Sequence, residues 1–242
     1  MPFTPSHAAA VLPFLRTPLP ASALLIGSMT PDLPFYLPVA FPWATHTALA
    51  VVTTDVLLGL VAWAVWHALL AEPALAAAPA SLRGRVPGPS PGLGTRLSSA
   101  GRIGWTLLAL AVGVATHVLW DEFTHPRRWG PVHVPLLAEQ WGPLAGYRWL
   151  QYATSVLGGV VLLVWFVRWW RRTPPRPGVR RPGVRWAWPL LAAVGGTVGA
   201  VAAFPAPDPG AAVFAGATYG GGAALGVALV LAAAWQVRHR HG

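Results

Sequence analysis

Histidine and aspartate side chains recur at a few positions in a chain that has few ionisable residues. His117 and Asp121 stand four positions apart, so on a helix both side chains leave the same face. His125 follows one turn later, directly before Pro126, which disfavours helix for the residue before it. Imidazole nitrogens and carboxylate oxygens are common ligands of catalytic zinc and common acid–base groups. The pattern therefore indicates a metal or catalytic site.

Three further residues with suitable side chains lie earlier in the chain. His7 begins the first apolar stretch after Thr4-Pro5, Asp32 lies in the turn sequence GSMTPDLP, and His46 precedes a long apolar segment. Taken singly, His7 is explained as an exposed helix-start residue and Asp32 as a turn residue. Asp121 and His125 could likewise form a structural pair. Taken together, the predicted metal ligands are His7, Asp32, His46, His117, Asp121 and His125. They could hold one divalent ion, with zinc expected, or two ions.

The composition decides what kind of protein must position these side chains. Of 242 residues, 55% are hydrophobic and 10% are charged, whereas soluble domains carry about 25% charged residues. The chain has no cysteine, which excludes disulfides, thiolate metal sites and cysteine nucleophiles. We therefore predict an all-α fold, a polytopic membrane helical bundle that forms a single membrane domain over residues 1–242.

About five transmembrane helices are predicted from apolar runs of sufficient length. They cover residues 47–71, 103–120, 152–170, 186–204 and 211–237. The apolar stretches 5–15 and 20–29 are too short to span, and we predict that they form an N-terminal short helical hairpin, interfacial or re-entrant. Glycines at four-residue spacing, such as Gly216 and Gly220, predict close helix packing in the last two spans.

Arginine gives the predicted orientation. Residues 72–102 read as a flexible cytoplasmic loop, and residues 168–185 as an Arg-rich cytoplasmic loop with the tandem repeat RPGVR. A multi-pass protein of the cell membrane with a cytoplasmic C-terminus follows, and tryptophans at the expected span ends agree with it. The six candidate ligands then gather at the outer boundary. The basic excess favours membrane lipids as partners over nucleic acid.

The remaining polar residues carry weaker predictions. Asp55 lies nine residues after His46, about half a helical turn out of phase, so we expect it to face away from that histidine. Arg127 and Arg128 follow His125 and could clamp an anionic headgroup or phosphate. Pairing with Glu122 and Glu139 explains these arginines equally well.

The motifs also resemble a known family. PFTPSH (2–7), GSMTPDLP (27–34), THTAL (45–49) and THVLWDEFTH (116–125) resemble an uncharacterised bacterial family of integral membrane proteins, a domain of unknown function with a PFTxSH-type start. More distantly, their order is similar to the YdjM-like membrane-bound metal-dependent hydrolases and to zinc-dependent phospholipase C. The resemblance covers residues 1–50 and 113–145. It implies a bacterial inner-membrane location and implicates the same ligands. His125 matches its position least closely.

Two departures from the YdjM-like pattern weigh against a dinuclear site. Leu33-Pro34 stands where that family has a second acidic residue, and Ala44 stands where it has part of an HR pair.

The sequence thus predicts a metal-dependent hydrolase acting at the outer membrane–water boundary on a lipid or an amphiphilic phosphate or ester. Asp32 or Asp121 would be the general base. The alternative is a non-enzymatic membrane protein whose His/Asp set is a structural clasp. A transporter is less favoured, because charge within the spans is confined mainly to Asp55.

Overall fold

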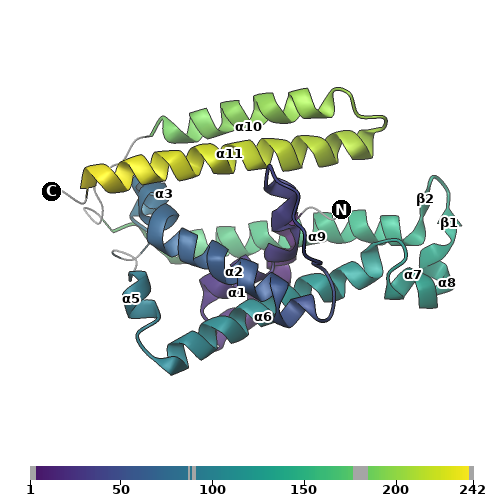
Figure 1. Ribbon diagram of the computed structural model, residues 1–242, viewed down its shortest axis with the longest axis horizontal. Helices are drawn as coiled ribbons and strands as arrows, with labels where there is room; N and C mark the ends of the chain where they lie inside the picture. Colours follow the sequence, from purple (N-terminus) through teal and green to yellow (C-terminus); the bar gives the residue numbers. More distant parts are fainter. Residues whose placement is uncertain (1–3, 87, 89–90, 177–184, 240–242) are drawn as a thin grey trace. The chain divides into compact units, whose positions relative to one another are not determined.

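The computed structural model describes residues 4–86, 88, 91–176 and 185–239, and nearly all of its secondary structure is helical (Figure 1). The strands β1 (Gln140–Trp141) and β2 (Leu144–Ala145) form one small antiparallel hairpin. The predicted all-α fold is therefore confirmed. In chain order the helical elements are η1 (Thr4–Arg16), α1 (Ala21–Gly27), η2 (Thr30–Tyr36), η3 (Ala50–Val52), α2 (Thr54–Val65), the π-helical η4 (Trp66–Leu70), α3 (Ala71–Ala77), α4 (Ala80–Arg83), α5 (Leu93–Arg96), α6 (Ala100–Thr124), α7 (Trp129–His133), α8 (Pro135–Ala138), α9 (Gly146–Arg172), α10 (Ala187–Ala203) and α11 (Pro209–His239).

Within the described residues, four helical stretches are long and apolar enough to cross a membrane. They are Ala50–Ala77, Ala100–His133, Gly146–Arg172 and Pro209–Arg238, and each contains most or all of one predicted span. The remaining predicted span corresponds to α10, whose 17 residues lie at the lower limit of the roughly 17–25 residues that a crossing needs. The chain has the helices of a multi-pass membrane protein.

Two segments differ from the prediction. The helix expected from Thr47 begins only at Thr54, and the residues between hold the short 3-10 helix η3. Thr47 and Thr53 bond through their hydroxyls to the backbone of Ala50 and Leu49, which gives this stretch an alternative to α-helical bonding. The predicted loop 72–102 contains short helices as well as irregular chain. In the predicted Arg-rich loop, residues 177–184 lie outside the described residues.

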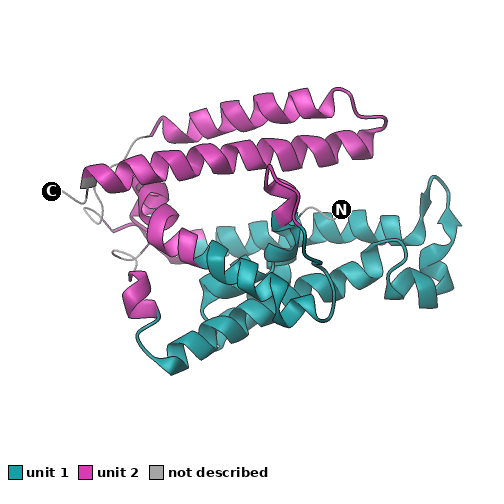
Figure 2. Cartoon of the chain, viewed as in Figure 1, with its two compact units in different colours: residues 1–33, 42–63, 97–169 teal, residues 34–41, 64–96, 170–242 magenta. Residues whose placement is uncertain are grey.

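The chain divides into two compact units (Figure 2). Unit 1 comprises residues 1–33, 42–63 and 97–169, and unit 2 comprises residues 34–41, 64–96 and 170–242. All six predicted metal ligands belong to unit 1.

In unit 1 the short helix α1 packs against the middle of α6. Leu24 of α1 and Leu110 of α6 are fully buried there. A Cβ atom at Gly27 would collide with the backbone of Leu110, and one at Gly113 would collide with the backbone of Leu24. Because glycine allows this contact, the predicted N-terminal hairpin docks on a long apolar helix, and the chain that follows α1 reaches the final turns of α6.

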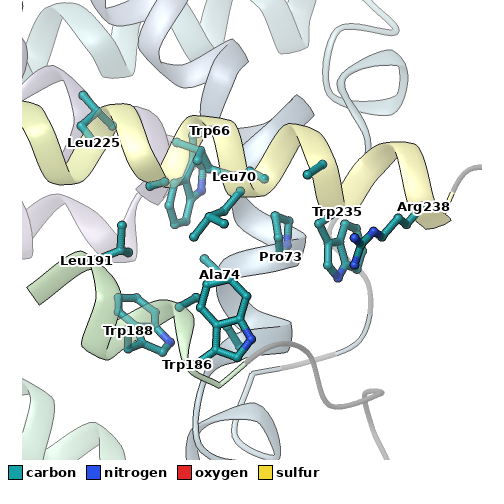
Figure 3. A pocket seen from close by; sticks show the side chains of 16 residues that line it. Trp66, Leu70, Pro73, Ala74, Trp186, Trp188, Leu191, Leu225, Trp235 and Arg238 are labelled. Carbon is teal, nitrogen blue, oxygen red and sulfur yellow. The ribbon is translucent and has the colours of Figure 1, made fainter. Parts of the chain in front are cut away.

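In unit 2, α10 and α11 approach each other through glycines, as predicted. Gly199 faces Gly216, and a Cβ at Gly220 would collide with the backbone of Gly195. Unit 2 also holds an apolar cavity of about 380 Å³ (Figure 3). Tryptophan side chains and an arginine line much of it: Trp66, Trp186, Trp188, Trp235 and Arg238. None of the predicted metal ligands lines this cavity.

Candidate metal centre

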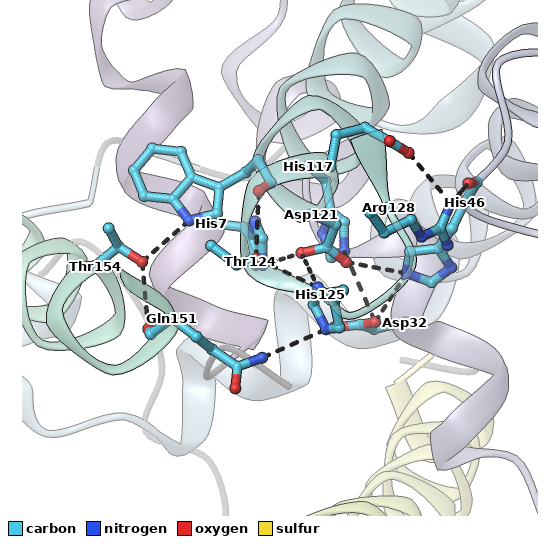
Figure 4. A network of polar contacts seen from close by, with 12 residues as sticks. His7, Asp32, His46, His117, Asp121, Thr124, His125, Arg128, Gln151 and Thr154 are labelled. Atoms are coloured by element: carbon cyan, nitrogen blue, oxygen red, sulfur yellow. Dashed lines mark hydrogen bonds and ion pairs between the residues drawn. The ribbon is translucent and has the colours of Figure 1, made fainter. Parts of the chain in front are cut away.

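Four separate elements bring the predicted ligands together in unit 1 (Figure 4). His7 comes from η1, Asp32 from η2, and His46 from the irregular segment before η3. The end of α6 supplies three residues: His117, Asp121 and His125, the last being the C-cap residue with extended backbone. The helix ends there because Pro126 disfavours helical geometry at the residue before it. The predicted convergence of the six side chains is therefore observed.

Two aspartates and two histidines form a four-membered ring of donor atoms. His46 Nε2 lies 3.2 Å from Asp32 Oδ1 and 3.6 Å from Asp121 Oδ2. His117 Nε2 lies 3.7 Å from Asp32 Oδ1 and 3.4 Å from Asp121 Oδ2. Each carboxylate thus faces both imidazoles. We call Asp32, His46, His117 and Asp121 the donor ring.

The spacing within the donor ring suits a bound metal ion. Two ligands held tetrahedrally at the Zn–N and Zn–O bond lengths of about 2.0–2.1 Å lie about 3.3–3.4 Å apart. The observed separations of 3.2 to 3.7 Å surround that value. Separations beyond about 3.2 Å are long for direct hydrogen bonds between these groups. His46 Nε2 and Asp32 Oδ1 are within hydrogen-bond distance, and the other three separations are longer. The donor atoms of Asp32, His46 and His117 all lie within 4.8 Å of one another, so these residues could hold a metal ion.

His117 can present a lone pair to the ring. Its Nδ1 lies 2.8 Å from the carbonyl oxygen of Ser28, which can only accept, so Nδ1 carries the proton. In the neutral imidazole Nε2 then offers its lone pair; it has no hydrogen-bond partner among the described residues, although the side chain is fully buried. An unpartnered buried nitrogen is costly, and a carbonyl-oriented histidine is the usual arrangement of a metal ligand.

His46 is held in place by its surroundings. Its backbone has the left-handed φ of 58°, which non-glycine residues adopt at a cost. Its N–H donates to Asp55 Oδ2 at 3.3 Å, and its carbonyl accepts from the Arg128 guanidinium at 2.7 Å. The Thr45 hydroxyl bonds to its Nδ1 at 2.9 Å, which leaves Nε2 for the ring.

The expectation that Asp55 faces away from His46 is therefore wrong. That expectation assumed one continuous helix, whereas the chain between these residues is irregular and turns the backbone of His46 back toward Asp55.

His7 and His125 lie against the other side of Asp121. Asp121 Oδ1 is 3.7 Å from His7 Nε2 and 3.4 Å from His125 Nδ1. Both His7 nitrogens and Asp121 Oδ1 lack a hydrogen-bond partner among the described residues, and both side chains are buried. Gln151 of α9 reaches His125 Nε2 at 3.5 Å. Of the histidines around Asp121, His125 is the most exposed, with 21% of its side chain accessible.

Two groups outside the membrane-spanning helices have shifted proton affinities. Burial, with His117 alongside, lowers the pKa of His7 from 6.5 to about 4, so this imidazole is neutral near pH 7. Burial opposes ionisation of Asp32, but His46, His117 and the Thr4 hydroxyl, which donates to Oδ2 at 2.6 Å, keep its pKa below 3.8. A neutral histidine and an ionised carboxylate are the protonation states that a metal ion requires.

The two predicted arginines are placed differently. Arg128 donates to His46 and lies 3.2 Å from Glu122, so its guanidinium is already engaged in the pairing that sequence reasoning gave as the alternative. Arg127 is exposed and has a left-handed φ of 61°. The anion-clamp role of Arg127 stays a prediction.

Sequence reasoning missed Thr4, Ser28, Asp55 and Gln151 as supporting groups. The Ser28 contribution is a backbone carbonyl, which side-chain identity does not reveal. Gln151 offered a weak signal, because it is a polar amide at the start of an apolar stretch and is buried.

Comparison with known proteins supports the first of the two resemblances. Residues 1–236 match a family model described as a domain of unknown function, DUF4184. No curated protein and no solved structure matches the chain. The more distant similarity to YdjM-like hydrolases therefore stays an expectation.

Proposed function

We propose that this chain, which belongs to the DUF4184 family of unknown function, is a metal-dependent membrane hydrolase acting on a lipid or an amphiphilic phosphate or ester. The observation that carries the proposal is the donor ring, in which two imidazoles and two carboxylates lie at metal-ligand spacing in a buried site. Six residues from four elements contribute to one cluster. A polar contact that only stabilised the fold would need fewer ionisable side chains.

The chemistry follows from the kind of group that such a cluster holds. A bound divalent cation, zinc being the expected one, lowers the pKa of water toward 7 and polarises a phosphoryl or carbonyl oxygen. Each ring carboxylate keeps one oxygen that does not face His46 and His117. These are Oδ2 of Asp32 and Oδ1 of Asp121, the two general-base candidates. Arg127 would meet an anionic group from the exposed side.

We propose an amphiphilic substrate because of where the donor ring would lie relative to the membrane. The donor ring lies on the final turns of α6, a helix of the length that crosses a bilayer, so the ring would stand near one membrane surface. Exposed Trp129, Trp141 and Trp149 follow this end of the helix in the chain, and exposed Trp43 lies three residues before the ring member His46, as in an interfacial aromatic belt. Arg83, Arg85, Arg96 and Arg102 lie before α6 or in its first turn, whereas Arg127 and Arg128 follow it. Under the positive-inside rule this excess favours the ring on the outer side, in a cell membrane with a cytoplasmic C-terminus.

A second candidate is a structural metal clasp without turnover. It is favoured by the closure of the donor ring, whose four side chains are at most 10% exposed, because structural sites are closed and catalytic sites keep an open position.

Elemental analysis of protein purified in detergent tests metal binding in either form. We expect at least one divalent ion per chain, a lower metal content in His117→Ala, and the wild-type content in His133→Ala, whose exposed histidine lies outside the ring. Release of phosphate or fatty acid from membrane-dispersed substrates then separates enzyme from clasp. Metal-free protein after purification with added zinc, or equal metal content in both variants, would refute the proposal.

A further inference from the structure

We infer that the cluster binds two divalent ions bridged by the carboxylate of Asp121. This inference rests on the proposed metal binding and says how many ions the site takes and which residues hold each. It is carried by the relative orientation of three imidazole rings and by the two faces of one carboxylate.

The rings of His7 and His117 cannot share an ion. They are stacked, with centroids 3.8 Å apart and planes only 15° from parallel. The lone pair of an imidazole lies in the ring plane, so the lone pairs of two stacked, nearly parallel rings run side by side and do not point at one ion. The donor atoms of His7, His117 and Asp121 all lie within 4.8 Å of one another, but the lone pairs of the two imidazoles do not point at a common ion position.

The rings of His46 and His117, by contrast, can share an ion. Their centroids are 5.2 Å apart and their planes are inclined by 66°, so their lone pairs can meet at a point. That point lies inside the donor ring. His7, displaced from His117 by the stacking distance, directs its lone pair to a second position alongside the first.

Asp121 connects the two positions. Its Oδ2 faces His46 and His117 at 3.6 and 3.4 Å, and its Oδ1 faces His7 and His125 at 3.7 and 3.4 Å. One carboxylate thus presents a different oxygen to each pair of imidazoles. In two-metal hydrolytic sites the two ions stand about 3.5–4 Å apart.

The two positions differ in their ligands and in their access. The first has four protein donors, Asp32, His46, His117 and Asp121 Oδ2, and is closed. The second has three, His7, His125 and Asp121 Oδ1, and lies beside His125, the most accessible ligand. Three ligands and an open position are the arrangement of a catalytic ion. With Asp121 occupied by both ions, Asp32 Oδ2 remains as the general-base candidate.

A pair of ions also narrows the substrate. Two cations at this separation can hold two oxygens of one phosphoryl group and stabilise the attacking and leaving oxygens together. Among the classes in the proposed function, an amphiphilic phosphate fits this better than a carboxylic ester.

Metal counting on purified full-length protein tests the inference. With zinc added and excess removed, we expect about two ions per chain in the wild type, about one in His7→Gln, and about two in the control His133→Ala. A wild type that holds one ion overturns the dinuclear inference and leaves the proposed function standing, whereas no ion overturns both. An unchanged count of two in His7→Gln also overturns the ligand assignment.

A spectroscopic measurement on the wild type does not depend on variants that fold. Protein loaded with Mn²⁺ should give the electron paramagnetic resonance spectrum of a spin-coupled ion pair, because Asp121 links the two ions. Spectra of isolated Mn²⁺ at saturating loading would contradict the bridge.

Discussion

Replacement of Asp55 by alanine tests whether the groups behind His46 set the metal affinity of the donor ring. Asp55 contributes no donor atom to the ring. It accepts the backbone N–H of His46, whose left-handed conformation costs about 1–3 kcal/mol and persists only because its surroundings hold it. Without Asp55, the carbonyl bond from Arg128 remains. We therefore expect His46 to leave its ligand position part of the time.

The structure also sets the size of the effect. A hydrogen bond to a charged group contributes about 1.5–3 kcal/mol, and the 3.3 Å separation of His46 N and Asp55 Oδ2 places this bond at the low end. A loss of about 1.5 kcal/mol corresponds to about a tenfold weaker Kd for the ion. This agrees with the 10- to 100-fold effects of removing supporting groups from metal sites.

The metal-free protein should respond in the opposite direction. Asp55 is fully buried, and its Oδ1 has no hydrogen-bond partner among the described residues. Burial of such a carboxylate is expensive, so its removal should leave the free energy of unfolding unchanged or higher. If Asp55 mattered only for folding, its removal would lower the metal affinity and the free energy of unfolding of the metal-free protein together.

Competition with a fluorescent zinc chelator measures the Kd, and denaturation of the chelated protein measures the stability. Thr54→Ala, at the neighbouring position of α2, is the matched control and should change neither. An unchanged Kd in Asp55→Ala, or a weaker Kd accompanied by an equal loss of metal-free stability, would refute the reasoning.

Three further predictions concern packing, pH and metal removal. Gly113→Ala should lower the melting temperature, because its Cβ would collide with the α1 backbone, whereas Gly104→Ala on the same helix meets open space and should be neutral or slightly stabilising. Stability of the metal-free protein should fall as the pH drops from about 6.5 to 4. The unfolded chain binds a proton at His7 that the folded protein, with its pKa of about 4, excludes, and the loss approaches about 3 kcal/mol. Denaturation at several pH values checks this, and His7→Gln should reduce the dependence. Chelation should lower the melting temperature of the wild type, with a loss of about 2.7 kcal/mol of stability where free metal stood at 100 times Kd, and it should have a smaller effect on His117→Ala.

The long helices were predictable because their signal is local. Apolar runs of sufficient length occur in α6, α9 and α11, and none of these helices contains a proline after its first residue. The start of α2 was not predictable in the same way. Thr47 and Thr53 have ordinary positions in an apolar run, but their hydroxyls bond to nearby backbone and shift the helix start to Thr54.

The ligand set was predictable from residue type, whereas the arrangement of its members was not. An ionisable residue such as His117 within an apolar helix is costly, and its spacing from Asp121 fixes their common face. The stacking of His7 on His117 depends instead on where the hairpin docks, which the close contact of Gly27 with α6 decides. No spacing in the sequence encodes that contact, which is why one ion and two ions could not be distinguished before the fold was known.

The ligands of the cluster are of two kinds, those on the regular helix α6 and those on less regular segments of the chain. α6 supplies His117 and Asp121 with a separation that its own backbone hydrogen bonds maintain, so these two ligands need little external support. His46 comes from irregular chain, and it is held by Thr45, Asp55 and Arg128. Asp32 in its 3-10 helix is similarly held by Thr4. Substitutions behind the irregular ligands should therefore weaken metal binding more than substitutions along the exposed face of α6, because only the former ligands have alternative conformations within reach.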